Sequence, residues 1–252
     1  MFSAVFSSAR HSAQAKDMKV RVIYSSLVHG VEKFHFEGSA VPCQLLLAGD
    51  MAVPVAAGPS GQVLIAASRY GDGRVVVMGH EEYMQDPKFH QFLQNAIEWL
   101  KPQQDAVVGV CKKPQLADHL SKTGSKVKSL HRYDGSVGVF CCDAYDDHQA
   151  AELVEFVKGG GGLLIGGQAW HWAHTHKEDV LHSFPGNKIT GVAGIYFTAI
   201  YGKKGSFPVP REIPHQSIFV QHGKDIKHDL GVLLDGIAQF DLSGQNVPSS
   251  VL

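Results

Sequence analysis

Residues 159–170, GGGGLLIGGQAW, have the residue types and spacing of an active-site turn, but they lack a nucleophile. A short apolar run at 163–165 is followed by Gly166 and Gly167, which predicts a strand that turns tightly into a helix. This is how α/β sheets present reactive groups. In a hydrolase turn the exposed residue carries a thiol or hydroxyl, whereas the equivalent position here is Gln168. The pattern therefore predicts a fold and no catalytic residue.

Two further motifs contain metal-ligand residue types, but neither is complete. Residues 80–84, HEEYM, begin like the zinc peptidase signature H-E-x-x-H, but Met84 stands where the second histidine is required. His171, His174 and His176 have a spacing that could place imidazoles on one helix face, but no acidic or thiol partner stands at ligand spacing. We interpret the three histidines as part of an exposed polar loop and predict no metal site.

The glycine-rich segment does not predict a bound cofactor. Residues 159–162 precede the apolar strand, whereas the glycines of a phosphate-binding loop follow a strand, and no G-K-[ST] sequence is present. Nucleotide binding is therefore not expected, and no cofactor is predicted.

The adjacent thiols of Cys141 and Cys142 lie near the end of a predicted strand, flanked by Phe140 and Asp143 instead of the small residues of a nucleophile turn. We interpret both cysteines as buried and structural; a residual thiol hydrolase or amidotransferase is the alternative. Asp143, with Asp146, stands at the mouth of this strand, where α/β sheets bind ligands. Capping of the following helix is the other explanation for these acidic residues.

The tryptophans after the double glycine are candidates for a contact surface. Trp170 and Trp172 on an exposed turn would anchor an interface, and packing over the end of the sheet is the alternative. The candidate interaction or vestigial site comprises Asp143, Gly166, Gly167, Gln168, Trp170 and Trp172.

The surrounding pattern predicts an α/β fold that positions this turn. Residues 87–100 repeat their apolar positions at helical spacing, and Pro102 follows where a helix should end. Strands are expected at 44–47, 63–67, 74–78, 107–110, 126–130, 137–142, 163–165, 192–197 and 217–220, with a hairpin turn at 71–73 and further helices near 116–122, before Gly159 and over 230–237. We predict a mainly parallel sheet with helices on both faces, and a β-hairpin-rich N-terminal segment that joins the same sheet.

Residues 27–46 match residues 233–252 at a constant offset, with glycine, phenylalanine and proline positions in register. This predicts a duplicated domain, and two unrelated joints with similar turn chemistry are the alternative. The expected organisation is a disordered tail over 1–20, an α/β domain over 21–232 and the start of a truncated second repeat over 233–252. The Ser- and Ala-rich start also has the acid-poor composition of a transit peptide, and a disordered tail is our interpretation.

Composition argues against several classes of function. With 23 basic and 24 acidic residues in 252, the formal net charge is −1, and no Lys/Arg cluster offers a surface for nucleic-acid phosphates. No apolar run approaches the roughly 20 residues that span a bilayer, so we expect membrane association to be peripheral or through a partner. The four cysteines lack the C-x-x-C spacing of a zinc site, which favours a reduced cytosolic protein.

Several segments of the sequence resemble the TRP channel-associated factor family. They are AVPCQLLLAGD at 40–50, GQVLIAASRYGDGRVVVMGHEEYM at 61–84, FLQNAIEWL at 92–100, GVFCCDAYDD at 138–147, GGGLLIGGQAWHWA at 160–173 and FPGNKITGVAGIYFT at 184–198. The resemblance covers nearly everything from about residue 20 onward. The HWAHTHKED segment departs from the more acidic stretch expected of the family.

The resemblance implies a class I glutamine amidotransferase-like, flavodoxin-like fold, without the enhancin-like peptidase domain into which longer members continue. It also implies a non-catalytic regulator that binds the cold- and menthol-sensing TRP cation channel and modulates its trafficking to the plasma membrane and its gating. Such a protein would be cytoplasmic and peripherally associated with the plasma membrane through its partner. The alternatives are the thiol enzyme named above and a small-ligand-binding repeat of a larger enhancin-like peptidase protein.

Overall fold

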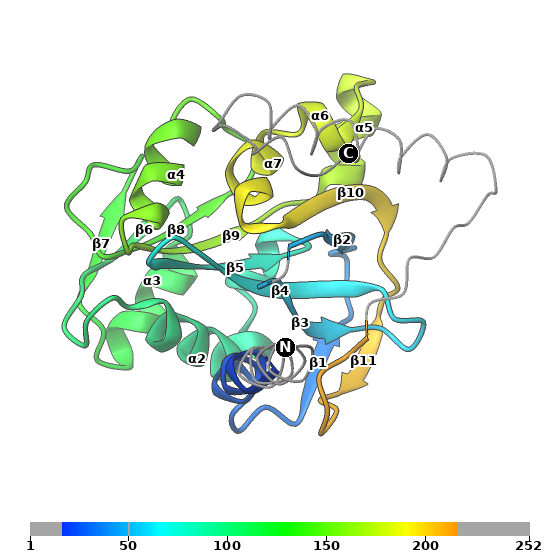
Figure 1. The fold of residues 1–252 in the computed structure, drawn as a ribbon, viewed down its shortest axis with the longest axis horizontal. Coiled ribbons are helices and arrows are strands. Elements are labelled where there is room, and N and C mark those ends of the chain that lie inside the picture. Colours follow the sequence, from blue (N-terminus) through cyan, green and yellow to red (C-terminus); the bar gives the residue numbers. More distant parts are fainter. Residues whose placement is uncertain (1–16, 50, 216–252) are drawn as a thin grey trace, which may run out of the picture.

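One large sheet organises the computed structural model, which describes residues 17–49 and 51–215 (Figure 1). Its strand order is β10-β2-β4-β5-β9-β8-β6-β7, and β3 pairs with β4 beside this path. The strands are β2 (Cys43–Leu47), β3 (Val53–Ala57), β4 (Val63–Tyr70), β5 (Gly73–Met78), β6 (Val108–Cys111), β7 (Val127–Leu130), β8 (Val139–Asp143), β9 (Gly162–Gly166) and β10 (Ile195–Tyr201). The strand expected at 217–220, the helix at 230–237 and the second repeat at 233–252 lie outside the described residues.

The sheet has a parallel half and an antiparallel half. β5, β9, β8, β6 and β7 run parallel to one another. β10, β2, β3 and β4 join them through antiparallel pairs, which include the β4–β5 hairpin. The predicted large, mainly parallel sheet is therefore confirmed for five of its nine strands, and the N-terminal hairpin segment joins it as predicted. The antiparallel half also contains β10, which comes from the other end of the described chain.

The strand order reverses inside the parallel half. From β6 the chain passes to the outer neighbour β7 and then returns to β8 on the other side of β6. In doubly wound α/β sheets, ligands bind outside the carboxyl ends of two such strands. Here β6 ends at Cys111 and β8 at Asp143.

Helices cover both faces of the sheet, as predicted (Figure 1). On one face lie a helix over residues 17–27, α2 (His90–Leu100) and α3 (Pro114–Lys122). The other face carries α4 (Ala150–Lys158), α5 (Ala169–His176), α6 (Val180–Ser183) and α7 (Pro185–Thr190). Each set buries its own apolar cluster against the sheet. Among the described residues, none of the helices combines the length and apolar character needed to cross a bilayer.

Helix α2 shows how the sequence determines these layers. Its buried side chains are Phe92, Leu93, Ala96, Ile97, Trp99 and Leu100, and most of them recur at the spacing of one helical face. Asp86 caps a 3-10 turn, η2 (Pro87–Phe89), that leads into the helix, and Lys101 ends it just before Pro102. The helix predicted over 87–100 is confirmed, with a tighter first turn.

A second, two-stranded sheet was not predicted from the sequence. β1 (Lys33–Phe36) pairs with β11 (Gly205–Pro208), and the rings of Phe36 and Phe207 pack together. The Tyr24 hydroxyl donates to the carbonyl of Pro210 (2.8 Å). These contacts join the start of the described chain to its end.

Three boundaries differ from the prediction. The helix over 17–27 begins inside the segment 1–20 that was expected to be a tail, and residues 1–16 lie outside the described residues. The strand predicted at 192–197 begins at Ile195, because a 3-10 turn, η3 (Gly191–Ala193), precedes it. Helix α4 has Gln149 at its cap position, not Asp146 or Asp147.

Candidate functional site

The turn between β9 and α5 lies at the carboxyl end of the parallel strands, as predicted from its double glycine. A side chain on Gly167 would meet Ala144 Cβ at 2.8 Å and the Phe184 ring at 3.1 Å. Neither Gly166 nor Gly167 has a left-handed φ. The glycines therefore allow close packing, whereas in a nucleophile elbow they permit a strained turn.

Hydrogen bonds tie three strand ends together at this turn. The backbone N–H of Gln168 donates to the Tyr145 hydroxyl (2.8 Å), which donates to Glu81 Oε2 (2.8 Å). Tyr145 follows β8, and Glu81 begins the 3-10 helix η1 (Glu81–Met84) after β5. The Gln168 side chain donates to the carbonyl of Val41 (3.3 Å). In an acyl-transfer enzyme, backbone N–H groups at such a turn face a developing oxyanion. Here the backbone N–H of Gln168 already donates its hydrogen bond to the Tyr145 hydroxyl.

Glu81 is a largely buried carboxylate whose side chain is 15% exposed. Burial acts to raise its pKa, but the hydrogen bond and charge of His80, together with the Tyr145 hydroxyl, outweigh burial and lower it. Burial and the neighbouring Glu81 raise the pKa of Tyr145. An ionised Glu81 beside a neutral Tyr145 is therefore the stable arrangement near neutral pH.

His80 has two competing partners. Its Nδ1 lies 3.3 Å from Glu81 Oε2 and 3.1 Å from the backbone nitrogen of Glu82, which donates to it. A single ring nitrogen cannot donate and accept at once. The ion pair with Glu81 therefore requires a protonated Nδ1, and the cap of η1 requires an unprotonated one. The Tyr145 hydrogen bond to Glu81 is compatible with both protonation states of His80 Nδ1.

A thiol that the sequence pattern did not single out lies beside this network. Cys43 Sγ donates to the carbonyl of Gly167 (3.4 Å), and burial raises the pKa of this thiol to about 12. Cys141 and Cys142 are free and buried, as predicted, and burial raises both of their pKa values. Because the thiolate is the nucleophile, these three residues are poorly suited to covalent catalysis near neutral pH.

The two tryptophans of α5 have different surroundings. The Trp170 indole N–H donates to the Val41 carbonyl (3.0 Å), and its ring stacks on Tyr201 at 4.4 Å. Tyr201 is 47% exposed, so Trp170 and Tyr201 form an aromatic pair at the surface beside the turn. Trp172 is 8% exposed and packs on Phe184. For Trp172 the alternative of packing over the end of the sheet is therefore confirmed, because this residue lies on the buried face of α5.

The histidines expected in a polar loop lie instead on helix α5. His171 and His174 lie next to the Trp170 ring, whereas His176 stacks on Trp172 at 4.4 Å. The three imidazoles thus have different neighbours and are not gathered around one point.

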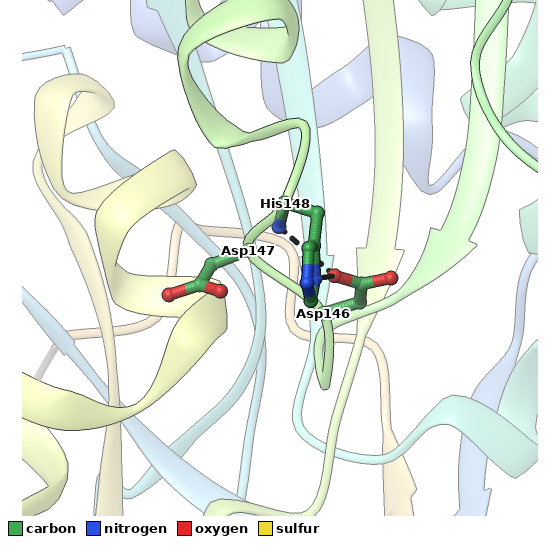
Figure 2. Close-up of side chains that lie close together, drawn as sticks. All are labelled: Asp146, Asp147 and His148. Atoms are coloured by element: carbon green, nitrogen blue, oxygen red, sulfur yellow. Dashed lines mark hydrogen bonds and ion pairs between the residues drawn. The ribbon is translucent and has the colours of Figure 1, made fainter.

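Acidic residues after β8 provide a weak candidate for a cation site. Ligand atoms of Asp146, Asp147 and His148 lie within 4.8 Å of one another. Asp146 pairs with His148 and Asp147 pairs with Lys188. Figure 2 shows the Asp147 carboxylate turned away from that of Asp146. These existing pairs explain the cluster, and we assign no metal to it.

The ends of β6 and β8, where the strand order reverses, carry charged residues. Lys112 has a left-handed backbone, with φ 53°, which is strained for a residue other than glycine. Lys113 is buried, with its amine 3.9 Å from the Glu82 carboxylate. Asp143 accepts the backbone N–H of Tyr145 (3.3 Å). Asp143 therefore shapes the loop that brings Tyr145 to the turn.

The structure brings most of the predicted site together and adds residues to it. Gly166, Gly167, Gln168 and Trp170 lie at one turn, and Glu81, Tyr145, Cys43 and Tyr201 join them. A signal for Glu81 was present, since HEEYM follows a predicted strand, after Gly79, at the carboxyl edge of the sheet. Cys43 and Tyr201 carry no local signal, because they reach the turn through the pairing of β2 with β10.

These features define a class of protein: an α/β domain whose sheet-end turn is closed by the Glu81, Tyr145 and Gln168 network and bordered by the aromatic pair of Trp170 and Tyr201. The family model described as TRPM8, N-terminal domain, matches residues 5–179 and 175–252. The chain belongs to the TRPM8 channel-associated factor family.

Curated relatives agree with this assignment. A TRPM8 channel-associated factor homolog of Xenopus laevis is 50% identical over 237 residues, which cover 93% of this chain and 26% of that protein. TRPM8 channel-associated factor 2 of Bos taurus is 46% identical, and that of Homo sapiens 44%, over 91% of this chain and 25% of each relative. The chain thus spans about a quarter of the length of these proteins.

Solved structures similar to this fold come from a bacterial peptidase. IMPa from Pseudomonas aeruginosa in complex with an O-glycopeptide has a TM-score of 0.61 and 17% identity, covering 79% of this chain and 24% of that one. A second structure, of the IMPa metallopeptidase, has a TM-score of 0.58 and 16% identity. At such identity the likeness concerns the fold alone. The class I glutamine amidotransferase-like fold stays a prediction.

Proposed function

We propose that this domain is a non-catalytic regulator that binds the cold- and menthol-sensing channel TRPM8 and modulates its trafficking to the plasma membrane and its gating. The observation that carries the proposal is 42–50% identity to TRPM8 channel-associated factors over at least 91% of the chain. Those proteins are about four times as long as this chain. Assigning the channel contact to this domain is therefore part of the proposal.

The β9–α5 turn supports a role without catalysis. Gln168 occupies the position where a nucleophile would stand, and its backbone N–H and side chain are both engaged in hydrogen bonds. The thiols nearest to the carboxyl end of the sheet are buried. A scaffold of this kind can retain an enzyme-like fold and offer its surface to a partner.

The aromatic pair Trp170 and Tyr201 supplies the contact surface in this proposal. Tyrosine and tryptophan dominate the binding energy of many interfaces, because they bury a large area at a small entropic cost. The hydrogen bond from Trp170 to Val41 and the stacking on Tyr201 hold the pair in place before a partner binds. Such a regulator would be cytoplasmic and would reach the plasma membrane through the channel.

Co-precipitation with TRPM8 from co-expressing cells, combined with surface biotinylation of the channel, tests the proposal. We expect the chain to co-precipitate and to change the channel's surface density, and Tyr201→Ala to weaken binding about ten-fold or more. Met18→Ala is the matched control, since Met18 is 67% exposed on the helix over 17–27.

The outcomes separate the function from its surface. No co-precipitation and an unchanged surface density would overturn the regulatory role. If Tyr201→Ala and Met18→Ala co-precipitate with the channel equally well, the regulatory role stands, and the contact surface lies outside the aromatic pair.

One observation favours a second candidate, a small-ligand-binding or structural repeat of a larger peptidase-like protein. The fold likeness to IMPa covers 24% of that peptidase. This candidate differs from the first because it requires no change in channel surface density. Nothing comparable favours the thiol enzyme, given the burial of the cysteines.

We also propose that a second copy of the domain begins at residue 233. The structure of the first copy supports this proposal. Leu27 and Phe34 are buried there, and Gly30 and Gly38 have left-handed φ values of 70° and 95°. Residues 233–252 keep a leucine, a phenylalanine and two glycines at the matching positions. A longer chain with both copies should show an unfolding transition that Gly244→Val lowers selectively, and the absence of any selective effect would contradict the duplication.

A further inference from the structure

A hollow with polar walls lies between α2 and α3, on the face of the sheet opposite α5. Its volume is about 250 Å³. The lining residues are Gln91, Gln94, Asn95 and Glu98 of α2, and Leu120, Thr123 and Ser125 at the end of α3. The two helices lie side by side on this face (Figure 1), and the stacked imidazoles of His90 and His119, 3.6 Å apart, join them.

The helix that forms one wall is fixed in place. Positions 91, 94, 95 and 98 share one face of α2, because they are spaced by three, four and seven residues. Asn95 donates to the carbonyls of Leu27 (3.0 Å) and His29 (2.7 Å) and accepts from Gln91 (3.2 Å). These bonds attach α2 to the end of the helix over 17–27, so the wall is ordered before any ligand binds.

The hollow carries little net charge. Glu98 is its one ionisable lining residue, and its carboxylate bonds to the amine of Lys101 at 2.5 Å. Lys101 has a side chain that is only 9% exposed. With the carboxylate already paired, neither a cation nor an anion finds an uncompensated charge here. The chemistry of the walls therefore favours a neutral ligand.

Polar groups with free hydrogen-bonding capacity are available to such a ligand. Within the described residues, the side chains of Gln94 and Ser125 make no hydrogen bond. Thr123 donates to backbone carbonyls and keeps its capacity to accept. Leu120, which also belongs to the lining, is fully buried and lies beneath these polar groups.

We propose that this hollow binds a small, neutral, polyhydroxylated molecule of monosaccharide size. Carboxamides and hydroxyls both donate and accept, as the hydroxyls of such a molecule do, so each can satisfy the other. The site lies away from the β9–α5 turn and does not depend on the channel contact.

The test is a titration of the ¹⁵N-labelled chain with methyl glycosides of glucose, galactose and mannose, observed through side-chain amide signals. We expect saturable shifts of the amide signals of Gln91 and Gln94 with at least one glycoside, and Gln94→Leu to weaken binding about five- to ten-fold. Gln115→Leu is the matched control, because Gln115 is an exposed glutamine of α3 outside the lining. Circular dichroism checks that both variants fold.

Two outcomes would overturn the proposal. One is the absence of saturable shifts with all three glycosides, which would leave the hollow filled by solvent. The other is equal binding by the two glutamine variants, since the glycoside would then lie elsewhere. Inorganic phosphate is titrated alongside, and preferential binding of phosphate would refute the neutral chemistry of the site.

Discussion

Two turns at the same edge of the sheet pass from strand to helix in different ways. After β9, neither Gly166 nor Gly167 has a left-handed φ, and hydrogen bonds from Gln168 close the turn. After β6, Lys112 has a left-handed φ of 53°, and Lys113 is the N-cap residue of α3. The glycine-rich turn is therefore relaxed, and the lysine turn is strained.

The comparison reverses what the sequence suggests. A double glycine after an apolar strand is typical of a turn that exposes a reactive atom, yet here the glycines serve the packing of Ala144 and Phe184. Backbone strain is found at functional sites more often than at ordinary turns. In this protein the strained residue is Lys112, which belongs to none of the sequence motifs. A closed, relaxed turn agrees with the proposal that this domain acts by binding.

The largest effect is expected from Gly167→Ala. The new Cβ would lie 2.8 Å from Ala144 Cβ and 3.1 Å from the Phe184 ring, and such overpacking lowers the free energy of unfolding by about 1–3 kcal/mol. Urea denaturation measures the change. Gly58→Ala is the control, because its Cβ would lie 3.6 Å from Phe207, an ordinary contact. Equal costs for both substitutions would mean that the turn tolerates a side chain and that its glycines have another purpose.

The next effect is expected from Tyr145→Phe. Loss of the hydroxyl leaves the Gln168 N–H and the Glu81 carboxylate without their shared partner, and an unsatisfied buried group costs about 1–3 kcal/mol. Thermal and urea unfolding report the loss. Tyr133→Phe is the matched control, because no hydrogen bond of the Tyr133 hydroxyl is found among the described residues. A stability equal to that of the control would show that the network does not hold the turn.

Local patterns predicted the elements, and long-range contacts explain what they missed. The β9 strand, its glycine turn and α2 follow from short apolar periodicities that any window of sequence contains. The site network does not, since Glu81 and Tyr145 meet only through the order of β5, β9 and β8. Likewise, the burial of Trp172 depends on Phe184, which a separate helix turn brings against α5.

Acid should weaken the closed turn through Glu81. The pKa of Glu81 is lowered from its ordinary value of 4.5, so its ionised form stabilises the fold fully above that pH, and this contribution is lost as the pH falls further. Glu81→Gln should flatten the fall of unfolding free energy between neutral pH and pH 3. The loss at neutral pH should be smaller than for Tyr145→Phe, because glutamine can still accept the Tyr145 hydrogen bond.

Unfolding free energies measured from neutral pH to pH 3 test this expectation, with Glu178→Gln as the control, because Glu178 is an exposed acid. If the two variants show the same pH profile as the unsubstituted chain, Glu81 does not couple the turn to protonation.

The smallest effect has the opposite sign and lies in the other turn. Lys112→Gly should raise the free energy of unfolding by a few tenths of a kcal/mol to about 1 kcal/mol. A left-handed residue with a Cβ destabilises the fold by about 1–2 kcal/mol, and glycine removes this strain. The greater entropy of glycine in the unfolded chain offsets about 0.5–1 kcal/mol of the gain. Lys122→Gly, at the end of α3, should instead destabilise by up to about 1 kcal/mol. Urea denaturation of the two variants side by side gives the comparison. A loss of stability in Lys112→Gly would mean that contacts of the lysine side chain outweigh the strain, and the contrast between the two turns would then rest on side chains and not on the backbone.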